Sequence, residues 1–403
     1  MKMGVVEKHV RLSHPPTEKE VEALRDAFRE DGFVVVAGVL DEGEIADTLD
    51  ELWNAPSLLG GAPGLDREDP TTWGNENWGL VAGTGDGVSK GFVDTRLDGM
   101  ELEVAWNNRL SDKVAAPFEA VLETPELWVV ESRFGVMRPT VGLPDPEGSG
   151  TIDRPEWRTC KSWAHVDQNF WLEPGFRGVQ GILTLTDATP TSGGFCCVPG
   201  FHNEFDTWAE EHPAETVEGS NRHLVLIPEA DPMLDRLVRV CAPAGSMIIW
   251  DSRLPHQNFP NADNTWRIVQ YITYDRAPVG DAEAVETRTD VALRKVAGVA
   301  ARRGVSLTDL FGDQTSFPGN LSPRALSLFG LLQYGEDETE LAARLALWDD
   351  EHGVAARDAS GMTARDLFDL AGAAEAEGDM AVATRLYQRA FRLDPGIDAA
   401  PRF

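Results

Sequence analysis

The chain has 403 residues, of which 42% are hydrophobic and 26% are charged, so it can bury a substantial core and is not a disordered tail. This length fits one large domain or two ordinary ones. The formal net charge is −31, from 36 basic and 67 acidic residues. A field of that sign repels phosphate backbones and anionic lipid surfaces, which argues against nucleic-acid and membrane partners.

Cysteine usage and hydropathy indicate the compartment. The four cysteines form no CxxC motif, so neither a disulfide framework nor a thiolate zinc site is expected. The first residues contain no apolar run of signal-peptide length, and no later stretch approaches the roughly 18 apolar residues of a membrane span. We therefore expect a cytoplasmic protein.

The N-terminal region reads as helix, strand, helix. Residues 17–30 have apolar side chains at helical spacing, and Thr17 with Glu20 forms a capping-box pattern at the start. Residues 33–38 form a short β-branched run, which predicts a strand, and a second helix is expected up to about Trp53.

Residues 55–99 interrupt this regular pattern. They are rich in Gly, Asn, Asp and Pro, and they include Trp73 and Trp78. A connection of this length without periodicity is either functional or poorly ordered. Two interpretations remain open, an irregular surface insertion and a lid over a pocket.

Strand patterns dominate the middle of the chain. Apolar or alternating runs, separated by Pro, Gly and Asp, occupy residues 127–134, 179–187, 194–199, 246–250 and 266–275. Many short strands without intervening helices predict an antiparallel barrel or sandwich rather than a doubly wound sheet.

After residue 275 the pattern becomes helical and rich in alanine. Residues 364–396 have small and aromatic side chains spaced as in one tetratricopeptide-type helical hairpin. Because solenoids need about three repeats for stability, a single hairpin is expected to cap the barrel domain or to mediate self-association.

One group of residues could carry chemistry. His165 and Asp167 are two apart in an extended segment, so their side chains lie on the same side of the strand. His256 follows the apolar strand of residues 246–250, and Arg267 lies within the next apolar run. An arginine inside a buried strand is costly unless it meets an anion.

Two imidazoles and one carboxylate are the ligands of the facial triad that binds Fe(II) and leaves coordination positions open. Those positions admit a chelating co-substrate and dioxygen. A planar, permanently charged guanidinium such as that of Arg267 suits bidentate capture of the far carboxylate of a dicarboxylic acid.

These motifs together resemble the phytanoyl-CoA dioxygenase-like branch of the Fe(II)/2-oxoglutarate-dependent oxygenases. The resemblance covers roughly residues 15–280. It rests on FVVVAG and LDEGEI after the first helix, on the HxD motif, on SGGFCCVPGFH at 192–202, and on GSMIIWDSRLPH at 245–256 with the arginine downstream.

The resemblance implies a mainly β fold, a double-stranded β-helix (a jelly-roll or cupin-like barrel) with flanking helices over residues 1–280, followed by a helical extension over residues 281–403. It implies that the iron ligands are His165, Asp167 and His256. It also implies that Arg267 holds the 2-oxoglutarate C5 carboxylate. Family members often carry a hydroxyl residue two positions after the distal histidine, and here Asn258 offers an amide donor instead.

The implied activity is hydroxylation, or another oxidation, of a substrate C–H bond by O₂, with 2-oxoglutarate converted to succinate and CO₂. Halogenating relatives lack the carboxylate ligand, so Asp167 argues against that outcome.

Polar and aromatic residues around the HxD motif have two interpretations, substrate contacts or ordinary core and turn residues. They are Arg133, Trp163, Gln168, Asn169, Trp171 and Gln180. Residues 130–180 carry no basic patch that would suit coenzyme A, so a small polar metabolite is the expected substrate. Two alternatives remain open: an oxygenase acting on a protein side chain docked through the C-terminal helices, and a non-catalytic barrel that binds or scaffolds.

Overall fold

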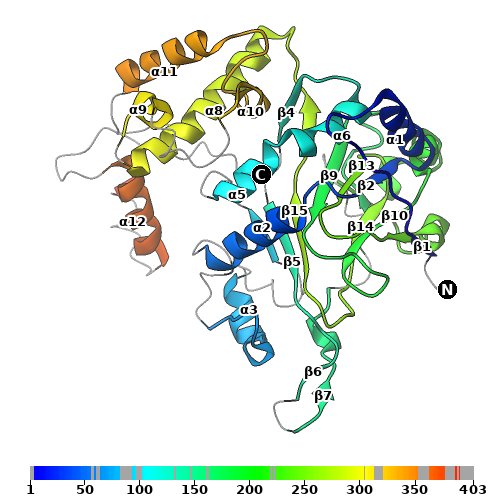
Figure 1. The fold of residues 1–403 in the computed structure, drawn as a ribbon. Helices are drawn as coiled ribbons and strands as arrows, with labels where there is room; N and C mark the ends of the chain where they lie inside the picture. The colour runs from blue at the N-terminus through cyan, green and yellow to red at the C-terminus, as the bar shows by residue number, and fades with distance from the viewer. Residues whose placement is uncertain are drawn as a thin grey trace. The chain divides into compact units, whose positions relative to one another are not determined.

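The computed structural model describes residues 4–55, 59, 64–81, 93–96, 102–130, 133–145, 148–159, 163–217, 220, 224–303, 305–312, 321–352, 363–376, 386–387 and 390. The chain divides into two compact units, Met1–Arg276 and Ala277–Phe403 (Figure 1). Among the described helices, none combines the length and the apolar character that a membrane span requires.

The first unit is built on two six-stranded sheets. Sheet A contains, in spatial order, β1 (Gly4–Val6), β12 (Val238–Val240), β10 (Gly194–Cys197), β14 (His256–Phe259), β8 (His165–Val166) and β11 (Val225–Leu226). Sheet B contains β2 (Phe33–Val36), β13 (Met247–Asp251), β9 (Val179–Thr184), β15 (Arg267–Tyr271), β5 (Arg133–Met137) and β3 (Val93–Arg96).

The two sheets share one core. A single cluster of buried side chains joins Phe195 and Val166 of sheet A to Ile182, Ile248 and Val269 of sheet B. Pairing within each sheet is antiparallel except where β1 joins β12. The predicted mainly β, jelly-roll architecture with flanking helices is confirmed.

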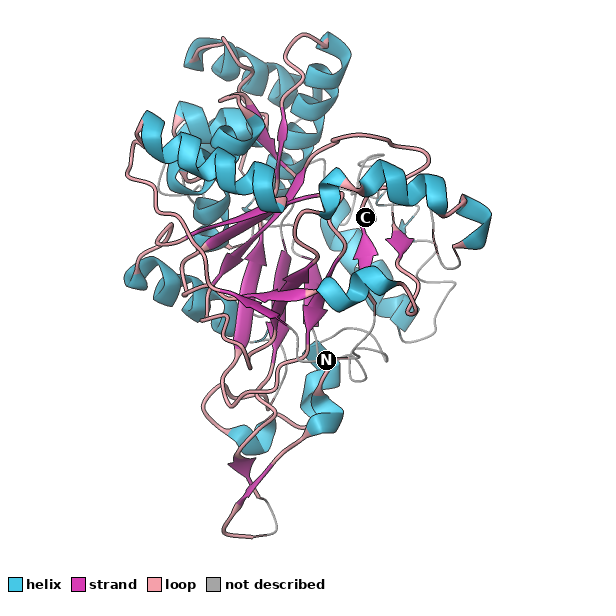
Figure 2. Ribbon diagram, turned by 90° about the vertical axis from the view of Figure 1, so that its right-hand side faces the viewer, coloured by secondary structure: helices cyan, strands magenta, loops and turns pink. Residues whose placement is uncertain are grey.

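The N-terminal helices follow the sequence pattern. Helix α1 (Glu18–Asp31) begins at the capping box of Thr17 and Glu20 and ends at Gly32, whose φ of 73° is the left-handed conformation that favours glycine. A Cβ at Gly32 would also lie 2.4 Å from the His202 ring. The other α-helices in the described part of this unit are α2 (Glu42–Asn54), α3 (Asn75–Val81), α5 (Glu103–Arg109), α6 (Asp112–Leu122) and α7 (Phe205–Glu211). Figure 2 shows helices in cyan and strands in magenta.

Two of the five expected strand runs divide in two. The run at 127–134 gives β4 (Leu127–Val129) and β5, and the run at 266–275 gives β15 and β16 (Tyr274–Arg276). Strand β16 pairs with β4 in a separate two-stranded sheet, whereas β15 pairs with β5 in sheet B. Because Ile272 at the change of sheet is itself buried, hydrophobicity does not mark the break. A small ribbon joins β6 (Leu143–Pro144) to β7 (Thr151–Ile152).

The region at 55–99 is more regular than its composition indicates. Its described part contains α3 and also β3, which forms the edge of sheet B by pairing with β5. Trp73 and Trp78 are 6% and 0% exposed. These two tryptophans pack inward, although most of the other residues between 64 and 77 are exposed or half-buried, so the surface-insertion interpretation stays a prediction. The lid interpretation for residues 55–99 stays a prediction, because residues 56–58, 60–63, 82–92 and 97–99 lie outside the described residues.

The second unit contains α8 (Ala282–Arg303), α9 (Leu307–Gly312), α10 (Pro323–Phe329), α11 (Glu338–His352) and α12 (Ala364–Ala376). Asp349 of α11 accepts hydrogen bonds from the backbone N–H groups of Leu307 and Thr308, each at 2.9 Å, and so caps α9. Most of the second half of the expected hairpin at 364–396 lies outside the described residues.

Candidate metal centre

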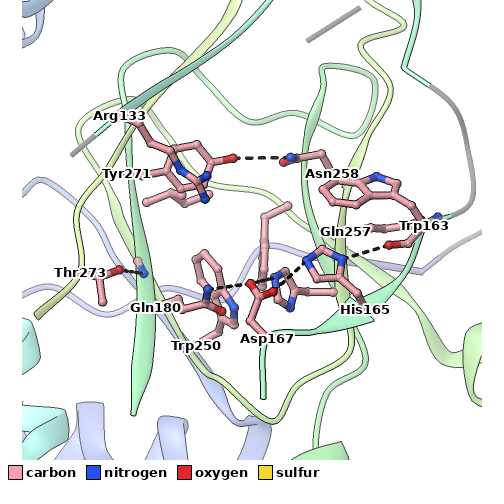
Figure 3. A pocket seen from close by; sticks show the side chains of 14 residues that line it. Arg133, Trp163, His165, Asp167, Gln180, Trp250, Gln257, Asn258, Tyr271 and Thr273 are labelled. Carbon is pink, nitrogen blue, oxygen red and sulfur yellow. Dashed lines mark hydrogen bonds and ion pairs between the residues drawn. The ribbon is translucent and has the colours of Figure 1, made fainter. Parts of the chain in front are cut away.

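Neighbouring strands of sheet A bring the two histidines together. His165 begins β8 and His256 begins β14, and the two are direct partners in the strand register. Their ring centroids are 4.4 Å apart, and both residues are buried. Asp167 follows β8 and turns its carboxylate toward His165 (Figure 3), and one ligand atom from each of the three residues lies within 4.8 Å of the others.

Backbone carbonyls fix the tautomer of each histidine. His165 Nδ1 lies 3.0 Å from the carbonyl oxygen of Trp163, and His256 Nδ1 lies 2.9 Å from that of Leu254. A carbonyl oxygen only accepts, so each Nδ1 carries the proton and donates it. Each Nε2 therefore presents its lone pair to Asp167, at 3.5 Å from Oδ1 for His165 and 3.6 Å from Oδ2 for His256.

The pKa shifts of His256 and Asp167 favour the forms that bind a metal ion. Burial, with the nearby imidazole of His165, lowers the pKa of His256 and keeps its ring neutral near pH 7. Burial raises the pKa of Asp167, whereas a positive charge beside it, on the imidazoles of His165 and His256, lowers that pKa below its usual value; a bound cation would act in the same direction. An ionised carboxylate and neutral imidazoles are the forms that bind a metal ion.

This donor set fits a divalent cation. Three lone-pair-bearing atoms converge, and without a shared proton or a cation they repel one another. Nitrogen and oxygen donors in this two-His, one-carboxylate arrangement suit Fe(II) and leave further coordination positions free. The Nδ1–H donors to backbone are the outer contacts that usually orient metal-binding histidines.

A pocket opens beside these three residues. It is also lined by Arg133, Trp163, Gln180, Gly181, Ile182, Phe195, Trp250, Gln257, Asn258, Tyr271 and Thr273. Arg133 lies over the ring of Tyr271, with its guanidinium carbon 4.4 Å from the ring centroid. Figure 3 shows the Arg133–Tyr271 pair across the pocket from Asp167.

Arg267, the predicted anion-binding residue, is buried and is not among the residues that line the pocket. It is 2% exposed, and its Nη2 donates to Asn258 Oδ1 at 3.2 Å. Asn258 itself lines the pocket, and its Nδ2 lies 3.5 Å from the hydroxyl of Tyr271. Burial lowers the pKa of Arg267, because removing a charged guanidinium from water costs free energy.

The residues predicted to contact substrate separate into two groups. Arg133, Trp163 and Gln180 line the pocket. The other three are not among its lining residues, and they bond to backbone: Gln168 donates to the carbonyls of Glu173 and Gly175, the Asn169 amide oxygen caps the following turn, and the Trp171 indole donates to the carbonyls of Ala209 and His212. The turn and core interpretation therefore describes Gln168, Asn169 and Trp171 in this structure.

Some lining residues were not anticipated. Tyr271 lies four residues after Arg267 in the same strand, and strand alternation places both on one face, so this residue could have been found. Trp250 and Phe195 are indistinguishable in sequence from ordinary core residues. Gln257 gives no signal either, although its side chain accepts a hydrogen bond from the Trp163 N–H at 3.2 Å.

The family of this chain follows from a match between its sequence and a family model. The model of the phytanoyl-CoA dioxygenase (PhyH) family matches residues 28–269, more than half of the sequence. The chain belongs to the phytanoyl-CoA dioxygenase family. It is accordingly an Fe(II)/2-oxoglutarate-dependent oxygenase, and His165, Asp167 and His256 form a group that could hold the iron.

Individual relatives are distant. A curated protein of Dictyostelium discoideum that bears the name of the same family is 23% identical over 266 residues, which is 61% of this chain and 72% of the relative. Among solved structures, the epimerase SnoN in complex with Fe3+, alpha ketoglutarate and nogalamycin RO is 17% identical, with 66% of this chain and 90% of that chain covered and a TM-score of 0.44. The crystal structure of GIG2 from Candida albicans is 11% identical, with 85% of this chain and 84% of that chain covered and a TM-score of 0.48.

Proposed function

We propose that this oxygenase hydroxylates a C–H bond of a small polar metabolite and releases succinate and CO₂ from 2-oxoglutarate. The iron ligands in this proposal are His165, Asp167 and His256. The observation that supports it best is the convergence of two proton-free Nε2 atoms and a carboxylate beside a pocket.

The chain's own residues have separable roles in this proposal. The carbonyls of Trp163 and Leu254 hold the two imidazoles in the tautomer that can bind metal. Arg267 binds the C5 carboxylate of 2-oxoglutarate, and Asn258, already bonded to Arg267, adds an amide donor. Bound Fe(II) would supply the activation of O₂ that the side chains cannot provide.

The pocket lining supports a small substrate with both polar and apolar parts. Its walls combine Trp163, Phe195 and Trp250 with the polar side chains of Arg133 and Gln180. The lining includes one arginine and no lysine among the described residues, whereas the phosphate groups of coenzyme A call for several cations. A coenzyme A ester is therefore not the substrate that this lining favours.

An anaerobic titration tests the proposal. Fe(II) and then 2-oxoglutarate are added to the purified protein, and the visible metal-to-ligand charge-transfer band of the chelate is recorded. We expect the band in the wild-type protein. Its absence there, or its persistence in both His165→Ala and His256→Ala, would contradict the assignment.

A further inference from the structure

Gln180 contacts the metal centre directly. It lies on β9 in the middle of sheet B, where its backbone pairs across from Trp250 of β13. Its Nε2 donates a hydrogen bond of 2.8 Å to Asp167 Oδ2 (Figure 3). An ionised carboxylate only accepts, so the amide nitrogen must face Asp167, and this orientation of the Gln180 amide is fixed.

This contact completes a pattern. His165 and His256 are each oriented by one hydrogen bond from Nδ1 to a backbone carbonyl. Asp167 lies just after β8, outside the regular strand, and its side chain is 31% exposed. The Gln180 amide gives the carboxylate the outer hydrogen bond that the backbone gives the two imidazoles. Such outer contacts are worth about 10–100-fold in metal affinity.

The remaining atom of the amide is also informative. Among the described residues, Gln180 Oε1 is buried without a hydrogen-bond partner. A residue that served only to satisfy its own polar groups would not leave a buried acceptor open. With Nε2 committed to Asp167, any ligand that bonds to Gln180 must do so through this acceptor.

We propose that Gln180 is a positioning residue of the metal centre. It engages Asp167 Oδ2 and so favours binding of the metal through Oδ1, as a ligand that occupies a single coordination position. This inference rests on the proposed function, because it takes Asp167 as an iron ligand. It reassigns Gln180 from substrate contact to support of the carboxylate.

Metal affinity in the absence of turnover tests the role. Mn(II) serves as a redox-stable probe of the iron site, and the EPR signal of free Mn(II) gives its Kd for the full-length protein. Gln180→Met keeps the length and volume of the side chain but removes the donor. We expect it to raise the Mn(II) Kd by about 10-fold or more, within the range found for such contacts.

Gln257→Met is the matched control, because Gln257 lines the same pocket but bonds to the Trp163 backbone rather than to Asp167. Circular dichroism and thermal unfolding establish that each variant is folded, and Gln180→His, which keeps a ring N–H donor, should recover part of the affinity. An unchanged Kd in folded Gln180→Met, or an equal loss in Gln257→Met, overturns the positioning role. Failure of the proposed function looks different, because wild-type protein would then bind Mn(II) no better than His165→Ala.

Discussion

Two regions of the barrel unit bury charged groups beside tryptophans, and they do so in opposite ways. Arg138, which follows β5, is 0% exposed and donates to the carbonyl of Trp73 and to the side chain of Asn75. Its guanidinium carbon also lies 5.0 Å from the ring centroid of Trp78 and 4.1 Å from that of Trp157. At this site, guanidinium N–H groups donate to oxygen acceptors, and the guanidinium cation lies over aromatic rings.

At the metal centre, hydrogen-bond acceptors face other hydrogen-bond acceptors. The lone pairs of His165 and His256 face the carboxylate of Asp167, and a pocket opens beside them. A cation completes this arrangement, whereas both Nη atoms of Arg138 already meet acceptors within the protein, and only its Nε is left without a partner among the described residues. Burial alone is therefore not a sign of function. A functional site is indicated instead by buried hydrogen-bond acceptors that face one another with no donor from the protein between them.

Replacing a histidine at the metal centre should have the largest effect. His256→Ala removes a nitrogen donor, and we expect Fe(II) affinity to fall by more than about 100-fold, since even outer contacts are worth about 10–100-fold. The charge-transfer band with 2-oxoglutarate should vanish, and the thermal midpoint should stay close to wild type. Full retention of the band in His256→Ala would show that His256 is not a metal ligand.

Arg267→Ala tests whether this buried arginine acts at the metal centre or, like Arg138, has a structural role. If Arg267 holds the C5 carboxylate, loss of a charge-assisted bidentate contact should raise the Kd for 2-oxoglutarate by about 10–100-fold while Fe(II) is retained. Arg267→Lys should lie between, because an ammonium group cannot reproduce the planar fork. The measurement is the charge-transfer titration at saturating Fe(II). An unchanged Kd for 2-oxoglutarate would make Arg267 a structural residue.

The opposite outcome is expected for Arg138→Met. The substitution leaves the Trp73 carbonyl and Asn75 without their buried donor, and this should lower the free energy of unfolding by about 1–3 kcal/mol. Chemical denaturation measures the loss, and Mn(II) affinity should remain at the wild-type value. If Arg138→Met kept the wild-type stability but bound Mn(II) more weakly, Arg138 would support the metal centre rather than the fold.

The sequence predicted which residues meet at the candidate metal centre only in part from local geometry. The i, i+2 spacing of His165 and Asp167 sets a shared face, whereas His256 lies far away in the sequence and was placed beside them by the family resemblance. The capping box of α1 was equally readable, since Thr17 and Glu20 act within one turn. For the His165–Asp167 pair and for the capping box, the signal and the structure involve the same few residues.

The Arg138 cluster and the role of Gln180 were not readable. Arg138 lies more than sixty positions from Trp73 and Asn75, and nothing in either segment reports the pairing. Gln180 was placed near the pocket, but its bond to Asp167 depends on how sheet B faces sheet A. The composition of residues 55–99 does not reveal that its tryptophans are buried, because that burial comes from tertiary contacts.

The smallest effect is expected at Trp163, where side chain and backbone have different roles. The Trp163 ring stacks on His165 with centroids 4.6 Å apart and is 38% exposed, whereas its carbonyl oxygen accepts the His165 Nδ1 proton. Trp163→Ala removes the ring but keeps the carbonyl, so the tautomer of His165 should persist. A stacking contribution of about 0.5 kcal/mol at this partly exposed position corresponds to only a two- to threefold rise in the Mn(II) Kd. Trp163→Phe, which keeps an aromatic face, should be nearly neutral, and the EPR titration measures both. A loss in Trp163→Ala as large as that in His256→Ala would show that the ring, rather than the carbonyl, orients the ligand.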